Sequence, residues 1–270
     1  MMRPEVKSLI DRGAIFYASH SGGKDSQAMY GYLRSVVPDS QIVLVNADLG
    51  EVEWEGTIDH IKANTVHPVN VVKAKKTLLG MVEKRFNDRP SVPSWPSAQY
   101  RQCTSDLKRG PIQKFIRNDM KARGATLGVN VMGIRAEESS ARSKMKAFKP
   151  NKELSKAGRT VHDWFPIHEW LEQEVFDYIA SLGQEAHWAY AAGNKRLSCV
   201  FCIMGCGGDL KNGAKHRPKL AAKYIELERK TGYSMFHKET LESKLKGIPI
   251  TVEPVQRGLA LEANGDKHYL

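Results

Sequence analysis

The sequence predicts an α/β fold in which a parallel, twisted sheet carries helices on both faces. Short apolar runs, typical of buried strands, alternate with segments whose apolar residues recur at helical spacing. Of the 270 residues, 26% are charged and 41% hydrophobic, a globular composition long enough to bury a core. Strands that alternate with helices favour a parallel sheet, because parallel neighbours need a crossover connection.

The elements follow one another regularly in the first half of the chain. The first helix begins at Asp25, and Pro38 ends it. After Arg135 the chain becomes polar and strongly basic over 140–159, and Gly183 is the expected C-cap of a later helix. We expect strands at 14–20, 42–50, 68–74 and 126–135, and further helices at 52–64, 75–87, 106–123, 170–183 and 216–231.

A glycine-rich loop lies at the junction of the first strand and the first helix. Its sequence is Ser21-Gly22-Gly23-Lys24-Asp25-Ser26. Glycines let backbone N–H groups approach a phosphate, and a helix N-terminus favours its negative charge. Lysine adds a point charge, and the serines add hydroxyl donors. The loop fits neither the Walker A pattern nor Gly-x-Gly-x-x-Gly. It therefore predicts a phosphate site of another type.

This loop resembles the PP-loop of the adenine nucleotide alpha hydrolases, the ATP pyrophosphatase superfamily, whose fold is Rossmann-like. In that superfamily the loop holds the β,γ-pyrophosphate while a substrate oxygen attacks the α-phosphate. Three later segments, 100–115, 133–142 and 162–179, resemble the phosphoadenosine-phosphosulfate (PAPS) reductase branch and its DNA phosphorothioation relatives. The resemblance spans about 14–210. It implies a nucleotide-binding domain over 1–135 and a mostly helical or irregular region over 136–270, packed on the catalytic edge.

The resemblance also implies roles for individual residues. The expected catalytic residues are Lys24, Asp25 and Arg135, with Asp25 also a candidate for organising Mg²⁺. On the substrate side we expect Lys108, Glu138, Ser139 and Arg142, although Arg142 could equally be a solvated charge. The expected nucleotide-binding residues are Ser19, Ser21, Gly22, Gly23, Lys24, Asp25, Ser26, Asp48, Gly133 and Arg135.

The sequence holds four cysteines, Cys103, Cys199, Cys202 and Cys206. Four thiolates suit a [4Fe–4S] cluster or a structural Zn²⁺ site. Zinc ribbons usually pair two Cys-x-x-Cys knuckles, whereas here one knuckle is extended by a third cysteine and the fourth is distant. We therefore favour a [4Fe–4S] cluster, with Zn²⁺ as the alternative.

The cysteine pattern also bears on the reaction. Soluble PAPS reductases carry a C-terminal Glu-Cys-Gly-x-His whose cysteine attacks sulfur, and this sequence has no cysteine after Cys206. If all four cysteines hold a cluster, none remains for that attack. The set looks more like the DNA phosphorothioation proteins of the DndC and SspD type. In these, ATP activates a DNA phosphate, pyrophosphate leaves, and sulfur from a cysteine desulfurase replaces a non-bridging oxygen.

We therefore expect an ATP pyrophosphatase-type sulfurtransferase that acts on DNA, with ATP, Mg²⁺, a cysteine desulfurase and other phosphorothioation proteins as partners. The alternatives are a PAPS or adenylyl-sulfate reductase, a tRNA thiolation enzyme and a non-catalytic nucleotide-binding module. The net charge of +11 and the basic segments 142–159 and 211–223 favour a nucleic-acid partner. Neither a signal peptide nor a membrane span is expected, so we place the protein in the cytoplasm, with homo-oligomers possible.

Overall fold

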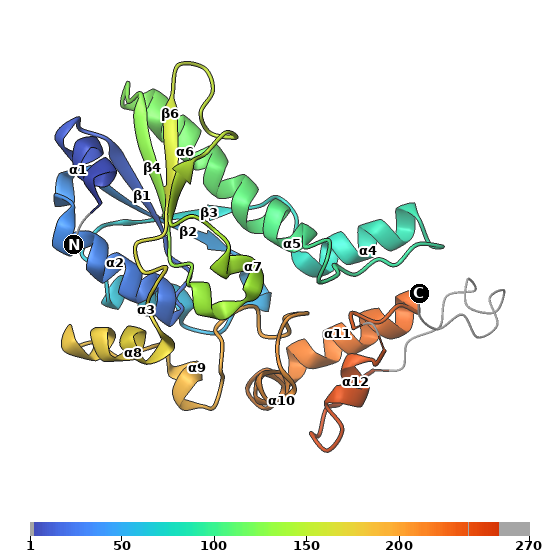
Figure 1. Cartoon of the computed structure of the whole chain (residues 1–270). Coiled ribbons are helices and arrows are strands. Elements are labelled where there is room, and N and C mark those ends of the chain that lie inside the picture. The colour runs from blue at the N-terminus through green and yellow to red at the C-terminus, as the bar shows by residue number, and fades with distance from the viewer. Residues whose placement is uncertain (1–2, 237, 254–270) are drawn as a thin grey trace. The chain divides into compact units, whose positions relative to one another are not determined.

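The computed structural model describes residues 3–236 and 238–253. Contacts divide the chain into two units (Figure 1). Unit 1 consists of Met1–Asp48, Glu55–Lys73 and Gly110–Trp188. Unit 2 consists of Leu49–Trp54, Ala74–Arg109 and Ala189–Leu270. The boundary expected between residues 135 and 136 falls inside unit 1.

Unit 1 is built on one six-stranded sheet with the strand order β3-β2-β1-β4-β6-β5. All neighbouring strands are parallel except β5, which runs antiparallel to β6. The predicted α/β class and its four predicted strands are confirmed, and β5 and β6 are additional. The strands are β1 (Ile15–Ser19), β2 (Ile42–Asp48), β3 (Val69–Lys73), β4 (Leu127–Met132), β5 (Phe148–Pro150) and β6 (Thr160–Trp164).

Helices cover both faces of this sheet, as predicted. Successive side chains of a strand point to opposite faces. In β1, Phe16 and Ala18 accordingly pack in the core under four helices, whereas Tyr17 packs in the core on the other face under α6 (Gly110–Ala122). The four helices on the first face are α1 (Pro4–Asp11), α2 (Lys24–Val36), α3 (Thr57–Ala63) and α8 (Glu172–Ser181).

Unit 2 is mostly helical and has its own apolar core, around the fully buried Tyr224. Its long helix α11 starts with Pro218 and ends before Gly232, which adopts φ +70°. Proline is favoured in the first turn of a helix, and glycine in the left-handed conformation is favoured just after its last residue. The helices of unit 2 are η2 (Gly50–Val52), α4 (Leu78–Asp88), α5 (Gln102–Thr104), a π-helical turn η3 (Ser105–Arg109), α10 (Gly207–His216), α11 (Pro218–Thr231) and α12 (Leu241–Lys244).

Short elements complete the described chain. In unit 1 these are η1 (Asp39–Gln41), η4 (Ala136–Glu138) and α7 (Ser140–Ser143), and α9 (Trp188–Ala191) begins at the last residue of unit 1. Within the described ranges, none of the helices has both the length and the apolar character needed to cross a lipid bilayer.

Candidate functional site

The predicted phosphate loop lies in unit 1, between the end of β1 at Ser19 and the start of α2 at Lys24. Gly22 adopts φ +79°, a conformation that favours glycine. The Ser26 hydroxyl accepts the backbone N–H of Ser21 over 3.1 Å and donates to the carbonyl of Gly23 over 2.8 Å. The loop is thus folded back on the first turn of α2, whose N-terminal N–H groups favour an anion.

The two predicted cations of the site, Lys24 and Arg135, meet at one carboxylate. Lys24 Nζ lies 3.1 Å from Asp25 Oδ2, and Arg135 Nε donates to Asp25 Oδ1 over 2.6 Å. Both cationic side chains are almost fully buried, at 4% and 3% exposure. The structure therefore brings together the three residues predicted to be catalytic, although Arg135 is 110 residues from Asp25 in the sequence.

Two further carboxylates close a ring of charges around these residues. Lys24 Nζ is also 3.1 Å from Glu172 Oε1, at the start of α8. Arg135 Nη1 donates to Glu137 Oε2, and that same oxygen accepts the backbone N–H of Glu172 over 2.7 Å. The ring contains two positive and three negative side chains. Neither Glu137 nor Glu172 was predicted, because only the fold brings them to the loop.

The ring stabilises the charged forms of two of its members, Arg135 and Glu137. Burial opposes the charge of Arg135, but Asp25 and Glu137 outweigh it and raise the pKa of the guanidinium. The hydrogen bond from Arg135 lowers the pKa of Glu137. By formal charge, the two cations and three carboxylates of the ring sum to one net negative charge.

Gly133 lets the end of β4 approach the first turn of α2. A Cβ atom at this position would lie 2.4 Å from the carbonyl oxygen of Asp25 and 2.6 Å from its carbonyl carbon. Real Cβ atoms do not approach backbone atoms that closely. The predicted residue Gly133 therefore lies at the loop, and its contact is with backbone.

Asp48 ends β2 at the same edge of the sheet. Its Oδ2 is 2.9 Å from Lys73 Nζ, at the end of β3. Because β1, β2 and β4 are parallel neighbours, Ser19, Asp48 and Gly133 follow or end adjacent strands at their carboxyl edge, where ligands of open α/β sheets bind. We call this edge the catalytic edge.

The predicted substrate-side residues of unit 1 support one another. Glu138 Oε2 accepts the backbone N–H of Arg135 over 3.1 Å and pairs with Arg142. The Ser139 hydroxyl caps α7 by accepting the backbone N–H of Arg142. The Arg142 carbonyl accepts a hydrogen bond from His168 Nε2 over 3.0 Å. These contacts hold the turn that carries Arg135, which is a positioning role.

A buried histidine below the loop was not predicted. His20 Nδ1 accepts the backbone N–H of Gly22 over 3.1 Å, so the ring is neutral with its proton on Nε2. Burial, together with nearby His60, lowers the pKa of His20 to about 3. Burial and His60 also lower the pKa of His187 to about 4. No sequence signal separates such a histidine from an ordinary core residue.

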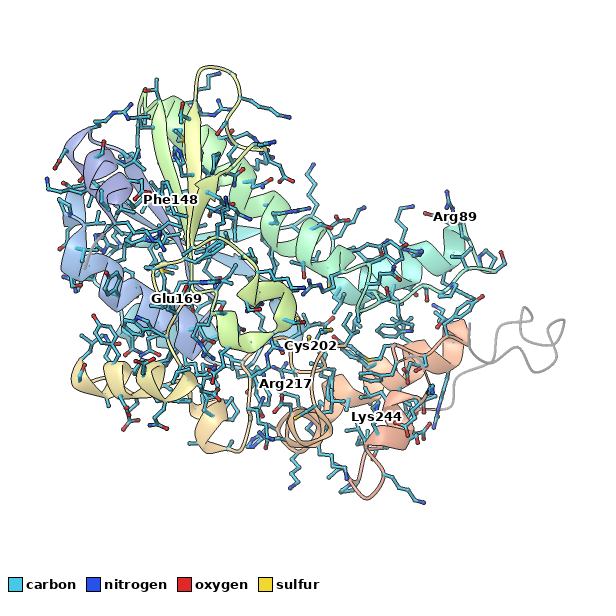
Figure 2. All side chains as sticks on the ribbon, in the orientation of Figure 1. Arg89, Phe148, Glu169, Cys202, Arg217 and Lys244 are labelled. Carbon is cyan, nitrogen blue, oxygen red and sulfur yellow. The ribbon has the colours of Figure 1, made fainter. Side chains whose placement is uncertain are left out.

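The four cysteines all belong to unit 2 and are free thiols. Burial and Cys202 raise the pKa of Cys103. Burial, and in smaller part Cys202 and Cys103, raise that of Cys199 to about 12 against the opposing effect of Lys108. Three thiols therefore share one neighbourhood with the Lys108 ammonium, whereas Cys206 is exposed at the N-cap of α10 (Figure 2 labels Cys202).

The chemistry of this set fits a thiolate-bound centre. The backbone N–H of Met204 donates to Cys202 Sγ over 3.4 Å, and that of Asp209 donates to Cys206 Sγ over 3.5 Å. Such N–H···S bonds stabilise thiolates and tune bound metals. Across residues 3–236 and 238–253, however, no group of three or more His, Cys, Asp or Glu side chains is already arranged to hold a metal ion. Three of the thiols lie near one another, but the described side chains are not yet arranged as a metal-binding site.

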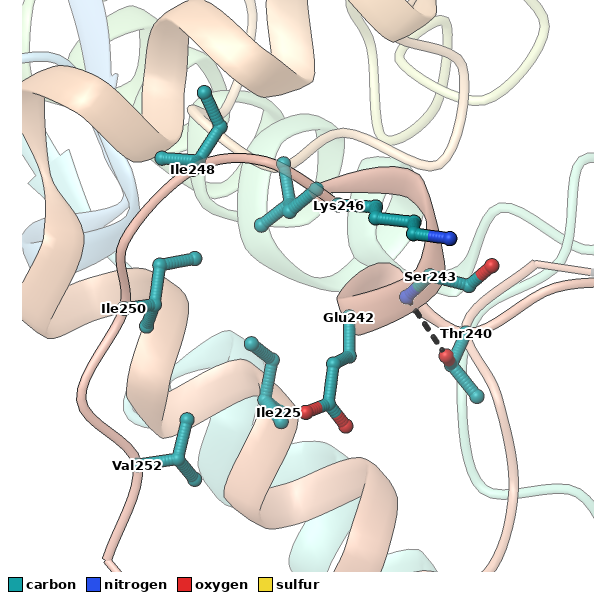
Figure 3. Close-up of a pocket in the computed structure, with 9 residues that line it drawn as sticks. Ile225, Thr240, Glu242, Ser243, Lys246, Ile248, Ile250 and Val252 are labelled. Carbon is teal, nitrogen blue, oxygen red and sulfur yellow. Dashed lines mark hydrogen bonds between the residues drawn. The ribbon is translucent and has the colours of Figure 1, made fainter.

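Unit 2 also contains a pocket of about 460 Å³ beside α11 and α12 (Figure 3). Its wall is apolar, with Ile225, Ile248 and Ile250, and Glu242 and Lys246 belong to its lining. The lining contains no cysteine and none of the predicted site residues.

The fold divides the basic segment 142–159 between two edges of the sheet. Arg142 and Lys144 follow η4 near the catalytic edge. The chain then runs antiparallel through β5, and 151–159 precede Thr160, which pairs with Leu127 at the start of β4. At about 3.3 Å per residue, a five-residue strand separates the two edges by roughly 15 Å. Only the first part of the basic segment therefore lies near the catalytic edge.

Comparisons with known proteins show which family and which relatives this chain resembles. A family model described as the phosphoadenosine phosphosulfate reductase domain matches residues 15–204. An uncharacterized protein of Methanocaldococcus jannaschii is 24% identical over 220 residues, which cover 80% of this chain and 48% of the relative. An uncharacterized 37.8 kDa protein of Escherichia phage 186 is 23% identical over 189 residues, which cover 65% of this chain and 55% of the relative.

The chain spans about half the length of the curated relatives it matches. Among solved structures, a crystal structure of phosphoadenylyl-sulfate (PAPS) reductase from Candida auris, in a phosphate complex, aligns with 74% of this chain and 96% of its own. The TM-score is 0.45 and the sequence identity 15%.

Proposed function

We propose, from the premise that this chain belongs to the phosphoadenosine phosphosulfate reductase domain family, that it is an ATP pyrophosphatase-type sulfurtransferase acting on DNA. The observation that carries the proposal is the convergence of buried Lys24 and Arg135 on Asp25, at the N-terminus of α2. Two fixed cations, a glycine-rich turn and a helix N-terminus are what a polyphosphate leaving group requires.

In the proposed reaction, a DNA phosphate oxygen attacks the α-phosphorus of ATP. The bond between the α-phosphorus and its bridging oxygen breaks, and pyrophosphate leaves with the electron pair. Lys24 and Arg135 would stabilise the charge that develops on this leaving group. The product is a DNA phosphate joined to AMP, which is now a good leaving group. A persulfide sulfur from a cysteine desulfurase then attacks the DNA phosphorus and expels AMP, and a thiol reductant cleaves the remaining S–S bond.

The net negative charge of the ring argues that the nucleotide arrives with a divalent cation. Mg²⁺ usually binds one or two carboxylates together with substrate phosphates, and Asp25 offers such a carboxylate next to both cations. When bound, Mg²⁺ would neutralise charge on the β- and γ-phosphates. The side chains of unit 1 would orient the phosphates and hold the loop through His20 and Ser26.

The cysteines support a second component of the proposal. Cys103, Cys199, Cys202 and Cys206 would hold a [4Fe–4S] cluster, with Zn²⁺ as the alternative. The support is the shared neighbourhood of three thiols and the two N–H···S bonds. The cluster would supply either redox chemistry or rigidity to unit 2.

The family membership itself favours one other candidate, a PAPS or adenylyl-sulfate reductase. A reductase would reduce a sulfonucleotide with a thiol partner and release sulfite. The same loop serves both candidates, because both bind an adenine nucleotide through phosphates. The released product distinguishes the two candidates: the proposed sulfurtransferase releases pyrophosphate, and a reductase releases sulfite.

Both candidates can be tested in the same tubes. Anaerobically purified protein is incubated with ATP or with PAPS and a thiol donor, with and without duplex DNA or tRNA, and pyrophosphate and sulfite are measured. We expect pyrophosphate from ATP, stimulated by DNA, and no sulfite from PAPS. Stimulation by tRNA alone would assign tRNA thiolation, and sulfite would assign the reductase. A Lys24→Met variant should lose product in every tube, whereas Lys62→Met, which changes an exposed side chain of α3, should not.

A further inference from the structure

A basic stripe runs along the solvent face of α6 in unit 1. Lys114, Arg117 and Lys121 are spaced three and four residues apart, so they lie on one side of the helix. The opposite side of α6 carries Ile116 and Met120, which are fully buried against the sheet. The stripe is therefore held in a fixed direction by the core.

The segment between β5 and β6 adds two more cations beside this helix. Leu154 is fully buried and packs with Ile116 and Met120 of α6. Gln113 Nε2 donates to Glu153 Oε2 over 2.6 Å. These contacts place the exposed Lys152 and Lys156 alongside α6, as Figure 1 shows for the two segments. We call Lys114, Arg117, Lys121, Lys152 and Lys156 the α6 basic surface.

The cations of this surface have no carboxylate partners among the described residues. Elsewhere on unit 1, exposed cations do pair: Lys7 with Asp11, Arg34 with Asp39 and Lys73 with Asp48. Like charges spaced three and four residues apart destabilise a helix. An unpaired stripe of this kind therefore has an electrostatic cost that a bound polyanion would remove.

We propose that the α6 basic surface binds the phosphate backbone of duplex DNA and thereby holds the substrate of unit 1. The seven residue steps from Lys114 to Lys121 rise by about 10 Å, which spans about three phosphates of one strand. The proposal rests on the proposed function for the identity of the polyanion. It adds where that polyanion lies, on the solvent face of α6, which covers the opposite face of the sheet from α2.

The composition of the surface favours a duplex over a single strand. Proteins that bind single strands stack bases on exposed aromatic side chains. None of the described large apolar side chains that are exposed, such as Tyr100 and Trp188, belongs to α6 or to 149–159. Cations without aromatic platforms contact backbone and give affinity that does not depend on sequence.

The test is the salt dependence of duplex binding. A variant with Lys114→Gln, Arg117→Gln and Lys121→Gln is compared with a matched control, Lys7→Gln, Arg34→Gln and Lys62→Gln, which loses the same charge from other exposed sites. Binding of a labelled duplex is followed by anisotropy from roughly 50 to 200 mM salt. Thermal unfolding checks that both variants are folded.

The stripe variant should bind at least about 10-fold more weakly than native protein at low salt, and its slope of log K against log salt should be less negative by about 2.7, from three lost contacts. The control should keep the native slope. A further variant, Lys152→Gln with Lys156→Gln, should reduce the slope by about 1.8. Equal losses in stripe and control variants, or native binding by the stripe variant, would overturn the proposal. So would tighter binding of a single strand than of the duplex.

This result is separable from the proposed function. The stripe variant keeps the phosphate loop, so its slow hydrolysis of ATP to AMP and pyrophosphate without DNA, in which water is the nucleophile, should equal that of native protein. If native protein releases no pyrophosphate but the stripe variant alone loses duplex binding, the surface assignment stands and the proposed reaction fails. If native protein releases pyrophosphate and the stripe variant binds the duplex as native protein does, the proposed reaction stands and the surface assignment fails.

Discussion

Arg135 and Asp25 form a buried ion pair over 2.6 Å that joins the end of β4 to the first turn of α2. The pair lies inside the ring that Lys24, Glu137 and Glu172 complete. Because the phosphate loop precedes α2 directly, this pair couples the loop to the turn after β4. Its removal should therefore affect both stability and nucleotide binding.

Replacing Arg135 by methionine should destabilise unit 1 by about 3 kcal/mol, because Asp25 and Glu137 lose their buried cation. Urea unfolding measures the loss. Arg142→Met is the matched control, since Arg142 also pairs with a carboxylate but is 30% exposed. A loss below about 1 kcal/mol is expected there. Equal losses in the two variants would contradict the importance assigned to the buried pair.

Gly133→Ala should disturb the loop without changing any charge. Its Cβ would lie 2.4 Å from the carbonyl oxygen of Asp25, so β4 or α2 must shift, at a cost of about 1–3 kcal/mol. Nucleotide binding measured by calorimetry should weaken in parallel. Gly207→Ala is a suitable control, because its Cβ would meet open space. Native nucleotide affinity in Gly133→Ala would show that the loop tolerates this shift.

Glu172→Gln should raise the affinity for pyrophosphate when Mg²⁺ is absent. Glu172 pairs with Lys24, so a phosphate must compete with this carboxylate for the ammonium group. We expect a gain of about 5-fold, or ~1 kcal/mol, in titrations with a chelator present. Glu174→Gln lies on the same turn, and its carboxylate accepts the N–H of Leu171 instead. It should leave the affinity unchanged, and a gain in both variants would point to a general charge effect.

Acid should destabilise unit 1 through His20 and His187. Their folded pKa values of about 3 and about 4 lie below the unfolded value, so the unfolded state binds protons first. Stability should be full above pH ~6.5 and fall below it, by up to about 1.4 kcal/mol per pH unit for each group. Urea unfolding at several pH values tests this. His20→Asn, whose Oδ1 can still accept the Gly22 N–H, should flatten the profile, and an unchanged slope would exclude His20 as a source.

Serine in place of any one of the four cysteines should reduce bound metal. We expect iron in anaerobically purified native protein and less than half as much in Cys103→Ser or Cys199→Ser, because a thiolate cluster needs each ligand. Elemental analysis distinguishes iron from zinc. Native metal content in Cys206→Ser alone would reduce the ligand set to the three thiols that share a neighbourhood. No metal in native protein would remove the cluster from the proposal.

The loop and the strands around it could be predicted because their signals are local. Residues 14–36 contain an apolar run, glycines and a helical pattern in succession. Strand β6 could not be predicted from such signals, because its central residues His162 and Asp163 are polar. The partly buried Asp163 accepts hydrogen bonds from Asn130 and Asn151, so polar contacts to neighbouring segments take the place of an apolar run in this strand.

The site itself was predictable only in part. Lys24, Asp25 and Arg135 could be named from motifs, but their common contact depends on the parallel pairing of β1 with β4. Glu137, Glu172 and His20 carry no local signal, since a carboxylate or histidine at those positions would suit any surface or core. The basic segment 142–159 is continuous in sequence, yet the reversal through β5 divides it between two edges.

The path of the chain between the two units has a consequence for biosynthesis. The chain enters unit 2 at Leu49, leaves it, enters again at Ala74 and enters finally at Ala189. The Val52 carbonyl accepts the backbone N–H of Val200 over 2.9 Å, so this contact forms only after the later segment has been synthesised. On the ribosome, the sheet of unit 1 has all its strands once Trp164 emerges, whereas apolar residues of 49–54 and 74–109 stay exposed until the last third is made. A single proteolytic cut after Trp188 would therefore leave all of unit 1 in one fragment, but it would divide unit 2 between the two fragments.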